Sequence, residues 1–193
     1  MSLNDLDNSF IDNKVPPNLT AIEQLDAKNQ PAALYLILEQ VAHVKGTFAI
    51  TEDIVLGILL RLMNGIVSDA GQYRRHAVRI VGAHVPLANW QSVPKLMAEL
   101  TNADEHSVDI VSLLAKVHAT FEKIHPFSDG NGRTGRRLML AQALNGGIAP
   151  PIVLKERKQA YYRYLEFAQT KDEYTPLEFF VAESIQSSGK LLL

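Results

Sequence analysis

The feature of this 193-residue chain that most constrains its fold is the segment 125–136, which lies between two stretches of helical pattern. Apolar side chains recur at helical spacing over 108–124, and a second helical stretch runs over 131–145 and stops at a Gly-Gly pair. Pro126 disfavours the α region at the preceding residue and should end the first helix there. The sequence therefore predicts a rigid turn held between two helices.

This turn contains the residue types that are required to transfer a phosphorus-containing group to a hydroxyl. His125 supplies an imidazole that titrates near neutral pH and can act as a general base. Asp129 is the only carboxylate in the turn, and Mg²⁺ prefers carboxylate and phosphate oxygens. The segment 130–132, Gly-Asn-Gly, lets the backbone direct N–H groups at an anion beside a positive helix N-terminus. Arg133 and Arg136 fall on one helical face and can fork onto phosphate oxygens.

Other interpretations of the turn fit less well. Gly130, Gly132 and Gly135 match the spacing of a dinucleotide-binding motif. That motif needs a preceding strand and an acidic residue about 20 positions later, whereas a helical pattern comes before these glycines. No Gly-Lys-Ser/Thr follows, as a P-loop requires. An ordinary interhelical turn would not explain a His-Pro entry followed by two arginines. The segment is therefore interpreted as an active site.

From His125 to Arg136 the chain resembles the Fic-domain signature, His-x-Phe-x-Asp/Glu-Gly-Asn-Gly-Arg-x-x-Arg, at every specified position. The resemblance implies the Fic fold, an all-α helical bundle with a short β-hairpin flap. It also implies a protein adenylyltransferase that moves AMP from Mg-ATP to a Ser, Thr or Tyr hydroxyl of a target protein. By this likeness His125 is the general base, Asp129 binds Mg²⁺ and Phe127 is a buried anchor. The implied nucleotide-binding residues of the signature are Asp129, Gly130, Asn131, Gly132, Arg133, Thr134, Gly135 and Arg136.

Two further regions are similar to the family. Residues 78–86 resemble the flap, on which a target protein would dock near 80–86 as an added strand. Tyr161, Tyr162 and Gln169 stand where family members place residues around adenine, and an aromatic face can stack on a base. Paired tyrosines on a helix also fit a core position. The flap residues implied to contact the nucleotide are Val81, Gly82, Ala83 and His84.

Several other transfers within the same fold stay open. They are phosphoryl transfer, transfer of another nucleotide, and removal of AMP; a non-catalytic nucleotide-binding module is a further alternative. Family members that phosphorylate tend to carry Lys where Gly132 stands, which favours AMP transfer. The intact His125 argues against a binding module, because binding alone needs no base.

The resemblance also implies a candidate for autoinhibition. Many Fic proteins are held inactive by a Ser/Thr-x-x-x-Glu-Gly/Asn helix whose glutamate pairs with the second signature arginine. The nearest match is residues 19–24, which carry Leu19 at the hydroxyl position and Gln24 at the last. Glu23 is therefore the candidate inhibitory residue, although it also suits the first turn of an ordinary helix. Constitutive activity, inhibition by a partner, inhibition by a segment absent from this sequence, and self-association are the alternatives.

Composition sets the remaining expectations. With 47% apolar and 21% charged residues, the chain suits one globular domain. We expect a polar arm over 1–18 and a single Fic domain over 19–193. The net charge of −2 argues against nucleic-acid binding. The absence of cysteine, of a signal peptide and of an 18-residue apolar run predicts a cytoplasmic protein with no membrane partner.

Helices are expected almost throughout the chain. Thr51 is expected to cap one of them. His118 falls on an apolar face, which favours a core histidine over a metal ligand. The arginine pairs 74–75 and 136–137 are expected to contact phosphates or solvent. The predicted helices span about 31–44, 52–64, 94–100, 107–124, 131–145, 156–169 and 175–187.

Overall fold

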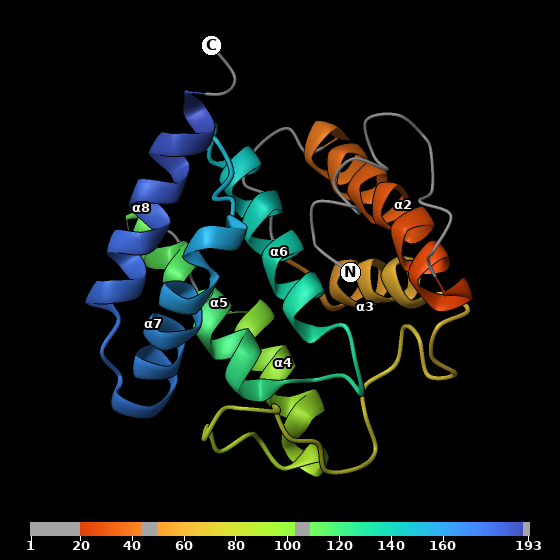
Figure 1. The fold of residues 1–193 in the computed structure, drawn as a ribbon. Helices are drawn as coiled ribbons and strands as arrows, with labels where there is room; N and C mark the ends of the chain where they lie inside the picture. Colours follow the sequence, from red (N-terminus) through yellow and green to blue (C-terminus); the bar gives the residue numbers. More distant parts are fainter. Residues whose placement is uncertain (1–19, 44–49, 103–108, 191–193) are drawn as a thin grey trace.

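The computed structural model describes residues 20–43, 50–102 and 109–190 (Figure 1). Within these ranges the protein has seven α-helices, two short 3₁₀ helices and no β-strand, so the predicted all-α class is confirmed. The α-helices are α2 (Ala21–His43), α3 (Glu52–Met63), α4 (Val93–Thr101), α5 (Ile110–Ile124), α6 (Asn131–Asn145), α7 (Lys158–Lys171) and α8 (Thr175–Gly189).

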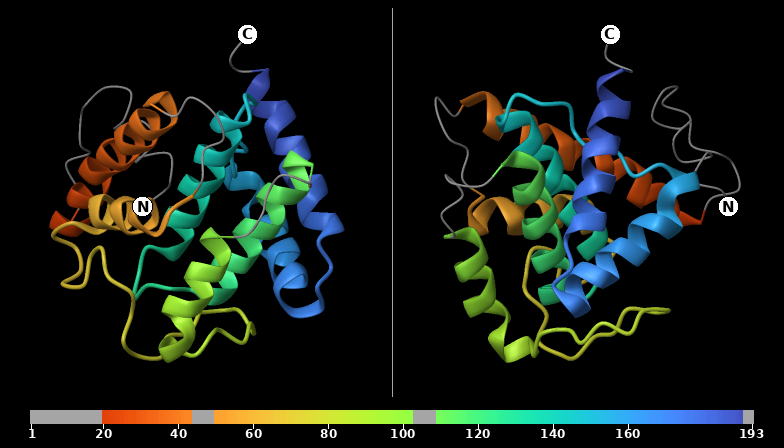
Figure 2. Two further views of the ribbon diagram at one scale, coloured as in Figure 1. Left: turned by 180° about the vertical axis from the view of Figure 1, so that it is seen from behind. Right: turned by 90° about the vertical axis from the view of Figure 1, so that its left-hand side faces the viewer.

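Helices α5 and α6 form the centre of the fold (Figures 1 and 2). Helices α2 and α3 pack together on one side of this pair, and α7 and α8 pack on the other. Both core clusters draw residues from α5 and α6, whose apolar side chains therefore face two ways. The first cluster includes Ile37, Ile58, Leu62, Met97, Phe121 and Leu138, and the second includes Leu114, Met139, Tyr161, Leu177 and Phe180.

The helix starts follow local capping rules. Thr51 accepts a hydrogen bond from the Ile54 N–H, as predicted, and Asp109 accepts from two backbone N–H groups of α5. Helix α2 begins at Ala21 instead of the predicted residue 31, so Pro31 lies inside it. A proline removes one helical hydrogen bond, but the buried side chains on both sides of Pro31 pack the helix onto the core.

Residues 75–89 leave the bundle as an extended loop (Figure 2). The chain turns back at Val81–Gly82, where the Ala83 N–H lies 3.4 Å from the Ile80 carbonyl oxygen and Gly82 has φ of +80°. The two arms of this loop form no strand pairing. The predicted flap therefore exists as a folded-back loop, whose base is held by the side chain of Arg74 instead of a β-ladder.

None of the helices in the described ranges has both the length and the apolar character to cross a bilayer. The predicted arm, 1–18, lies outside the described residues.

Candidate active site

The imidazole of His125 lies just beyond the end of α5. The helix stops at Ile124, as Pro126 predicts. His125 itself adopts the left-handed conformation, with φ of 50°, and its N–H donates to the Phe121 carbonyl at 2.9 Å. This conformation costs a non-glycine residue about 1–2 kcal/mol. Such strain persists where the surroundings fix the residue, which is common at active sites.

The surroundings of His125 leave its imidazole uncharged near neutral pH. Its Nδ1 lies 3.2 Å from the Glu122 carbonyl oxygen and donates to it in the tautomer that leaves Nε2 as an acceptor. Burial is the main influence and lowers the pKa of His125. The Glu122 carbonyl and Asp129 oppose this shift, while the charge of Arg74 adds to it. The free nitrogen is therefore available as a base.

Arg74 fixes the backbone around His125. Its guanidinium is almost fully buried and donates to four carbonyl oxygens. Two belong to the end of α5, Ile124 (3.3 Å) and His125 (2.7 Å), and two to the base of the flap, His76 (2.8 Å) and Ala88 (2.6 Å). The expectation that Arg74 contacts phosphate or solvent is therefore wrong. The last carbonyl groups of a helix have no donor within the helix, and one guanidinium can donate to several of them.

The side chain of Asn131 closes the turn after His125. Its amide is buried and forms two hydrogen bonds with the backbone of Phe127, each of 2.9 Å: Oδ1 accepts from the N–H and Nδ2 donates to the carbonyl. The Phe127 ring is fully buried between Tyr73 and Phe121, with ring centroids 5.9 and 6.1 Å away. The predicted burial of Phe127 is thus confirmed, and the ring anchors the turn from below.

Gly130, the residue that precedes α6, has a conformation that only glycine adopts without strain, with φ of +83°. It has no side chain to accept hydrogen bonds from the first-turn N–H groups of α6, so these groups remain available to an anion. A Cβ atom here would also lie 2.9 Å from the Met63 Sδ atom. The backbone itself therefore forms the floor of the turn.

We expect Gly130→Ala to destabilise the protein more than Gly147→Ala. Both glycines have positive φ, so alanine costs about 1 kcal/mol or more at each. Only Gly130 has a close neighbour, since nothing lies within 4 Å of a Cβ at Gly147. Urea unfolding of both variants measures the difference. Equal losses would mean that Met63 moves aside freely and does not constrain the turn.

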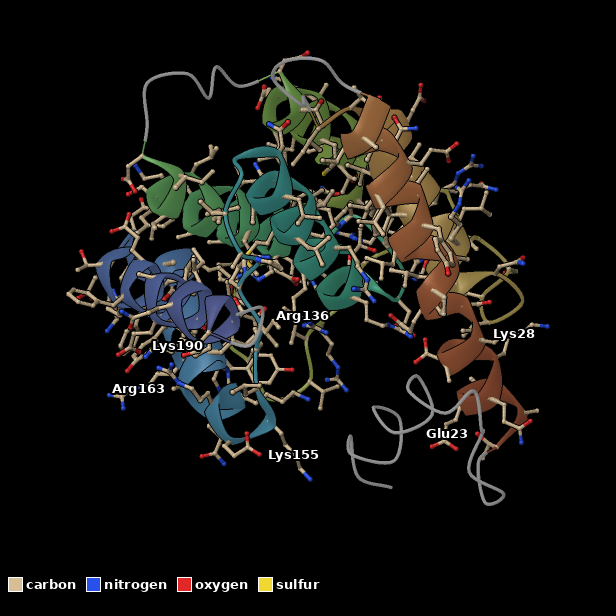
Figure 3. All side chains as sticks on the ribbon, turned by 90° about the horizontal axis from the view of Figure 1, so that it is seen from above. Glu23, Lys28, Arg136, Lys155, Arg163 and Lys190 are labelled. Atoms are coloured by element: carbon tan, nitrogen blue, oxygen red, sulfur yellow. The ribbon has the colours of Figure 1, made fainter. Side chains whose placement is uncertain are left out.

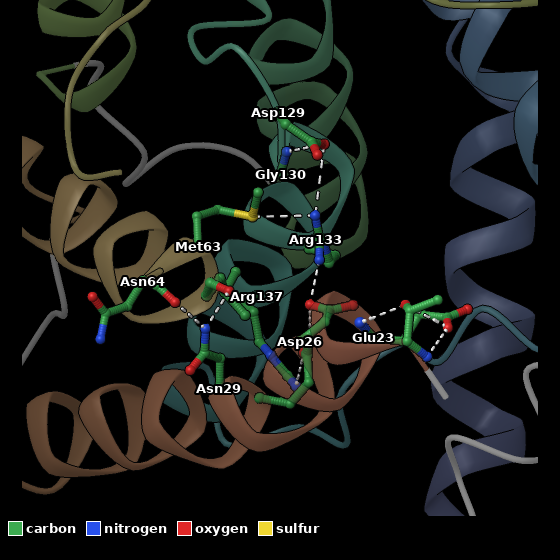
Figure 4. A network of polar contacts seen from close by, with 12 residues as sticks. Glu23, Asp26, Asn29, Met63, Asn64, Asp129, Gly130, Arg133 and Arg137 are labelled. Carbon is green, nitrogen blue, oxygen red and sulfur yellow. Dashed lines mark hydrogen bonds and ion pairs between the residues drawn. The ribbon is translucent and has the colours of Figure 1, made fainter. Parts of the chain in front are cut away.

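Arg133 is held from three sides (Figure 4). Its guanidinium donates to Asp26 on α2, and Nη2 lies 3.1 Å from the Met63 Sδ atom. The same nitrogen is 3.6 Å from Asp129 Oδ1. These contacts place Arg133 between α2, α3 and the turn, with its direction largely fixed.

The next two arginines point in different directions. Arg136 reaches toward the turn, and its Nη1 lies 3.3 Å from the place where a side chain on Gly132 would begin. Arg137 instead donates to Gln30 on α2 at 3.2 Å and does not line the cleft, although it remains partly exposed to solvent. Its partner lies 107 positions away in sequence, too far for local pattern to reveal.

The turn, the flap and α7 together line one cleft of about 670 Å³. Residues separated by half of the chain therefore meet at one site. The predicted site residues that line it are Val81, Gly82, Ala83, His125, Asp129, Gly130, Asn131, Gly132, Arg133, Arg136, Tyr161, Tyr162 and Gln169.

Three predicted residues are placed elsewhere. His84 is exposed on the flap and does not line the cleft. Thr134 is fully buried behind the turn. Gly135 faces the core, where a Cβ would lie 2.7 Å from Glu122 Oε1 and 3.0 Å from the His118 ring. Successive side chains point in different directions around a helix, so Thr134 and Gly135 face away from the cleft that Arg133 and Arg136 line. The linear signature does not show this.

The adjacent tyrosines 161 and 162 of α7 differ in environment. Tyr161 is buried, and its hydroxyl lies 2.7 Å from His118 Nε2. Burial lowers the pKa of His118 to about 3, so this histidine is neutral, as expected of a core residue. Tyr162 is 50% exposed and Gln169 is buried at the cleft wall. The Tyr162 ring contacts the Tyr161 ring and has Lys158 Nζ 5.6 Å from its centroid, so its exposed part is what the cleft offers to a base.

Asp129 has the exposure that a metal ligand needs. Its carboxylate is 63% exposed beside the cleft, and Oδ1 accepts from the Gly130 N–H at 2.5 Å. Mg²⁺ commonly takes one or two carboxylates and completes its shell with phosphate and water oxygens. Across the ranges that the structure covers, no cluster of three or more potential ligands occurs. With its exposed carboxylate, Asp129 fits a metal that a bound phosphate would share.

Glu23 lies at the start of α2, apart from Arg136 (Figure 3). It forms a capping box with Thr20: its carboxylate accepts from the Thr20 N–H (2.8 Å) and hydroxyl (2.7 Å), and its own N–H donates back to that hydroxyl. These hydrogen bonds lower the pKa of Glu23. In this arrangement the Glu23 carboxylate caps the start of α2, which is the role in an ordinary helix that the sequence also suggested.

The cleft also contains residues that the sequence patterns did not indicate. Glu122 reaches it from the last turn of α5, one turn before His125, and Arg79, Arg163 and Glu166 line it from the flap and α7. Helical spacing places Glu122 and His125 on one face, which would have been a usable signal. The others depend on how α7 and the flap pack, so no local pattern could identify them.

Comparisons with known proteins agree with this architecture. Residues 49–143 match the sequence model of the Fic/DOC family. The chain is similar to two proteins named protein adenylyltransferase Fic. It is 34% identical to that of Drosophila virilis over 133 residues, 65% of this chain and 26% of that protein. It is 32% identical to that of Drosophila yakuba over 150 residues, 73% of this chain and 30% of that protein. The chain thus spans less than a third of either relative.

Solved structures show the same fold. Fic-1 (aa134–508) from C. elegans superposes with a TM-score of 0.85 and 24% identity, over 100% of this chain and 58% of that one. BepC protein from Bartonella tribocorum, solved with bound AMPPNP, superposes with a TM-score of 0.60 and 17% identity, over 81% and 85% of the two chains. With the signature turn, the helical fold and the sequence match in agreement, this chain belongs to the Fic/DOC family.

Proposed function

We propose that this chain is a protein adenylyltransferase that transfers AMP from Mg-ATP to a Ser, Thr or Tyr hydroxyl of a target protein. The observation that carries the proposal is the placement of His125. Its free imidazole nitrogen lies at a cleft that the N-terminus of α6, with Arg133 and Arg136, also lines. A base facing an anion site is the arrangement that attack of a hydroxyl on a phosphate requires.

In the proposed reaction, Nε2 of His125 accepts the proton of the target hydroxyl. The hydroxyl oxygen then bonds to the α-phosphorus of ATP, and pyrophosphate leaves. The hydrogen bond from Nδ1 to the Glu122 carbonyl supports this role, because it fixes both the ring orientation and the tautomer. The strained backbone of His125 supports it too, since the surroundings hold this residue in a conformation that the chain does not prefer.

The other wall of the cleft would hold the phosphates. The N–H groups at the start of α6 offer hydrogen bonds and the positive end of a helix dipole. Arg133 and Arg136 add two guanidiniums. Asp129 would hold Mg²⁺ together with phosphate oxygens, and the ion would neutralise phosphate charge. Tyr162 would stack on the base, with Gln169 at its edge.

The target protein would enter along the flap. Residues 79–83 and 85 line the same cleft as residues of α6 and α7. The arms of the flap form no ladder with each other. Apart from the turn bond between the Ala83 N–H and the Ile80 carbonyl, their backbone groups could pair with an extended segment of a target at 80–86, which would present its hydroxyl to His125.

Phosphoryl transfer is the second candidate, and Gly132 disfavours it. Members of the family that phosphorylate tend to have Lys at this position. Here a side chain at Gly132 would begin 3.3 Å from Arg136 Nη1, so a lysine would crowd and repel that guanidinium. The present residue leaves Arg136 free to reach the anion site.

The direct test is to incubate the purified chain with Mg²⁺ and ATP and to weigh the intact protein. We expect a gain of one AMP per modified hydroxyl, on the chain itself or on an added target. A gain of one phosphate would replace the proposal with phosphoryl transfer. ATP binding without any gain of mass, on the chain or on proteins of a cell lysate, would indicate a binding module.

We expect Glu23→Gln to lower the thermal stability of the protein slightly and to leave the transfer rate unchanged. The reason is that Glu23 is exposed and serves the capping box of α2. Thermal unfolding and initial rates measure the two effects, with the exposed Glu39→Gln on the same helix as control. A clear rise in transfer rate would instead identify Glu23 as the inhibitory glutamate that the family resemblance implies.

A further inference from the structure

The side chain of Glu122 is buried yet belongs to the wall of the cleft. It is only 5% exposed, and its Oε2 lies 3.7 Å from His125 Nδ1. Its second oxygen, Oε1, has no hydrogen-bond partner among the described residues. A buried carboxyl group with an unsatisfied oxygen costs free energy, and a similar apolar side chain would avoid that cost. Glu122 therefore brings a charge-bearing group next to the base at the expense of stability.

Helix α6 packs its first turns over this carboxyl group. A Cβ on Gly135 would lie 2.7 Å from Glu122 Oε1, and one on Gly132 would lie 3.8 Å from it. Gly132 and Gly135 thus leave room for the glutamate behind the turn. Their small size has a structural purpose besides backbone freedom.

Several ionisable groups face Glu122. Arg136 approaches from α6 and Tyr161 from α7, while His118 and His125 lie on its own helix or at its end. Burial raises the pKa of Glu122 to about 7, although Arg136 acts in the opposite direction. A small change in surrounding charge near neutral pH therefore decides whether this carboxyl is ionised.

We propose that Glu122 is a positioning residue that holds the imidazole of His125 and stabilises its protonated form. This inference rests on the proposed role of His125 as the base. When Nε2 accepts the hydroxyl proton, a positive ring forms 3.7 Å from the carboxyl group. A carboxylate at that distance, shielded from solvent and salt, attracts the imidazolium strongly. The two groups then titrate as a coupled pair.

The test compares Glu122→Gln with Glu99→Gln, an exposed glutamate on α4. The titration of His125 is followed by NMR in the intact protein, and its signal is assigned from the His125→Ala variant. We expect the proton affinity of His125 to fall about tenfold in Glu122→Gln, because an opposite charge nearby favours the protonated form. The turnover number should fall by a similar factor, while the KM for ATP stays close to that of the wild type.

Glu122→Gln should also change the pH dependence of stability. The folded-state pKa of Glu122 lies above its ordinary value of 4.5. The contribution of this group to the free energy of unfolding is therefore fully present below about pH 4.5 and is lost as pH rises through about 7. The wild type should lose this stability on going from pH below about 4.5 to above about 7, and the glutamine variant should not. Urea unfolding across this range measures the difference.

An unchanged His125 titration in Glu122→Gln would overturn the inference, even if the variant were less stable. The NMR measurement needs no substrate, so it is independent of transfer activity. The wild type could show no transfer while Glu122→Gln still lowers the proton affinity of His125. That result would overturn the proposed function and support the role of Glu122. If the wild type transferred AMP and Glu122→Gln left the titration of His125 unchanged, the proposed function would stand and the role of Glu122 would be overturned.

Discussion

Replacing His125 with alanine is expected to reduce the rate of AMP transfer by about 10²- to 10⁴-fold, the usual contribution of a general base. The affinity for ATP should stay close to that of the wild type. The reason is that the groups placed to hold the phosphates belong to α6, and none of their contacts passes through the imidazole. Intact-mass kinetics and calorimetric titration with Mg-ATP measure the two quantities.

The matched control is His76→Ala, which removes an imidazole that is exposed and distant from the turn in sequence. The Arg74 hydrogen bond to residue 76 involves the main-chain carbonyl, so the substitution leaves it intact. We expect a near-normal transfer rate in this variant. If His125→Ala lost ATP affinity together with rate, the imidazole would have a structural role in shaping the cleft, and the base would have to be sought elsewhere.

Replacing Arg74 with methionine is expected to destabilise the fold by about 3 kcal/mol or more. Methionine fills similar space but leaves four carbonyl oxygens without their donor. A buried acceptor left unsatisfied costs about 1–3 kcal/mol, and water can reach only some of these four. The transfer rate should fall as well, because the backbone of His125 and both ends of the flap lose their common anchor.

Urea unfolding of Arg74→Met, Arg74→Lys and Arg75→Met tests this prediction. Arg75 is the exposed neighbour, so its replacement should leave the free energy of unfolding almost unchanged. Lysine should recover only part of the loss, since its point charge cannot match the planar fork of arginine. If Arg74→Met unfolded at the same urea concentration as Arg75→Met, the buried guanidinium would have no net stabilising effect.

The helices show how far local pattern determines this fold. The predicted ranges for α3 to α8 agree with the structure to within a few residues. Helices α3 and α5 start at a capping side chain, and α4 and α8 have a proline in their first turn. The predicted start of α2 at Pro31 is ten residues too late, because proline favours the first turn of a helix and here lies inside it. Burial of both halves against the core overrides that local preference.

The two arginine pairs mark the limit of such reasoning. In the sequence, Arg74–Arg75 and Arg136–Arg137 look alike, and each pair separates in the structure. Arg74 is buried and its neighbour is exposed, while Arg136 lines the cleft and its neighbour binds α2. The direction of each side chain depends on which distant segment packs against it, and adjacent residues on a chain point different ways.

By itself, the sequence determined the helical class, the position of the turn and the chemical types in it, because capping, proline and glycine effects and apolar spacing act over a few residues. The tertiary structure decided which groups surround that turn. Glu122 lies buried beside His125, close to it in sequence. The contacts of Arg74 with the end of α5 and of Arg133 with Asp26 instead join segments that are up to 107 positions apart. Their electrostatic and hydrogen-bond energies depend on distance and burial, which arise only when the helices pack.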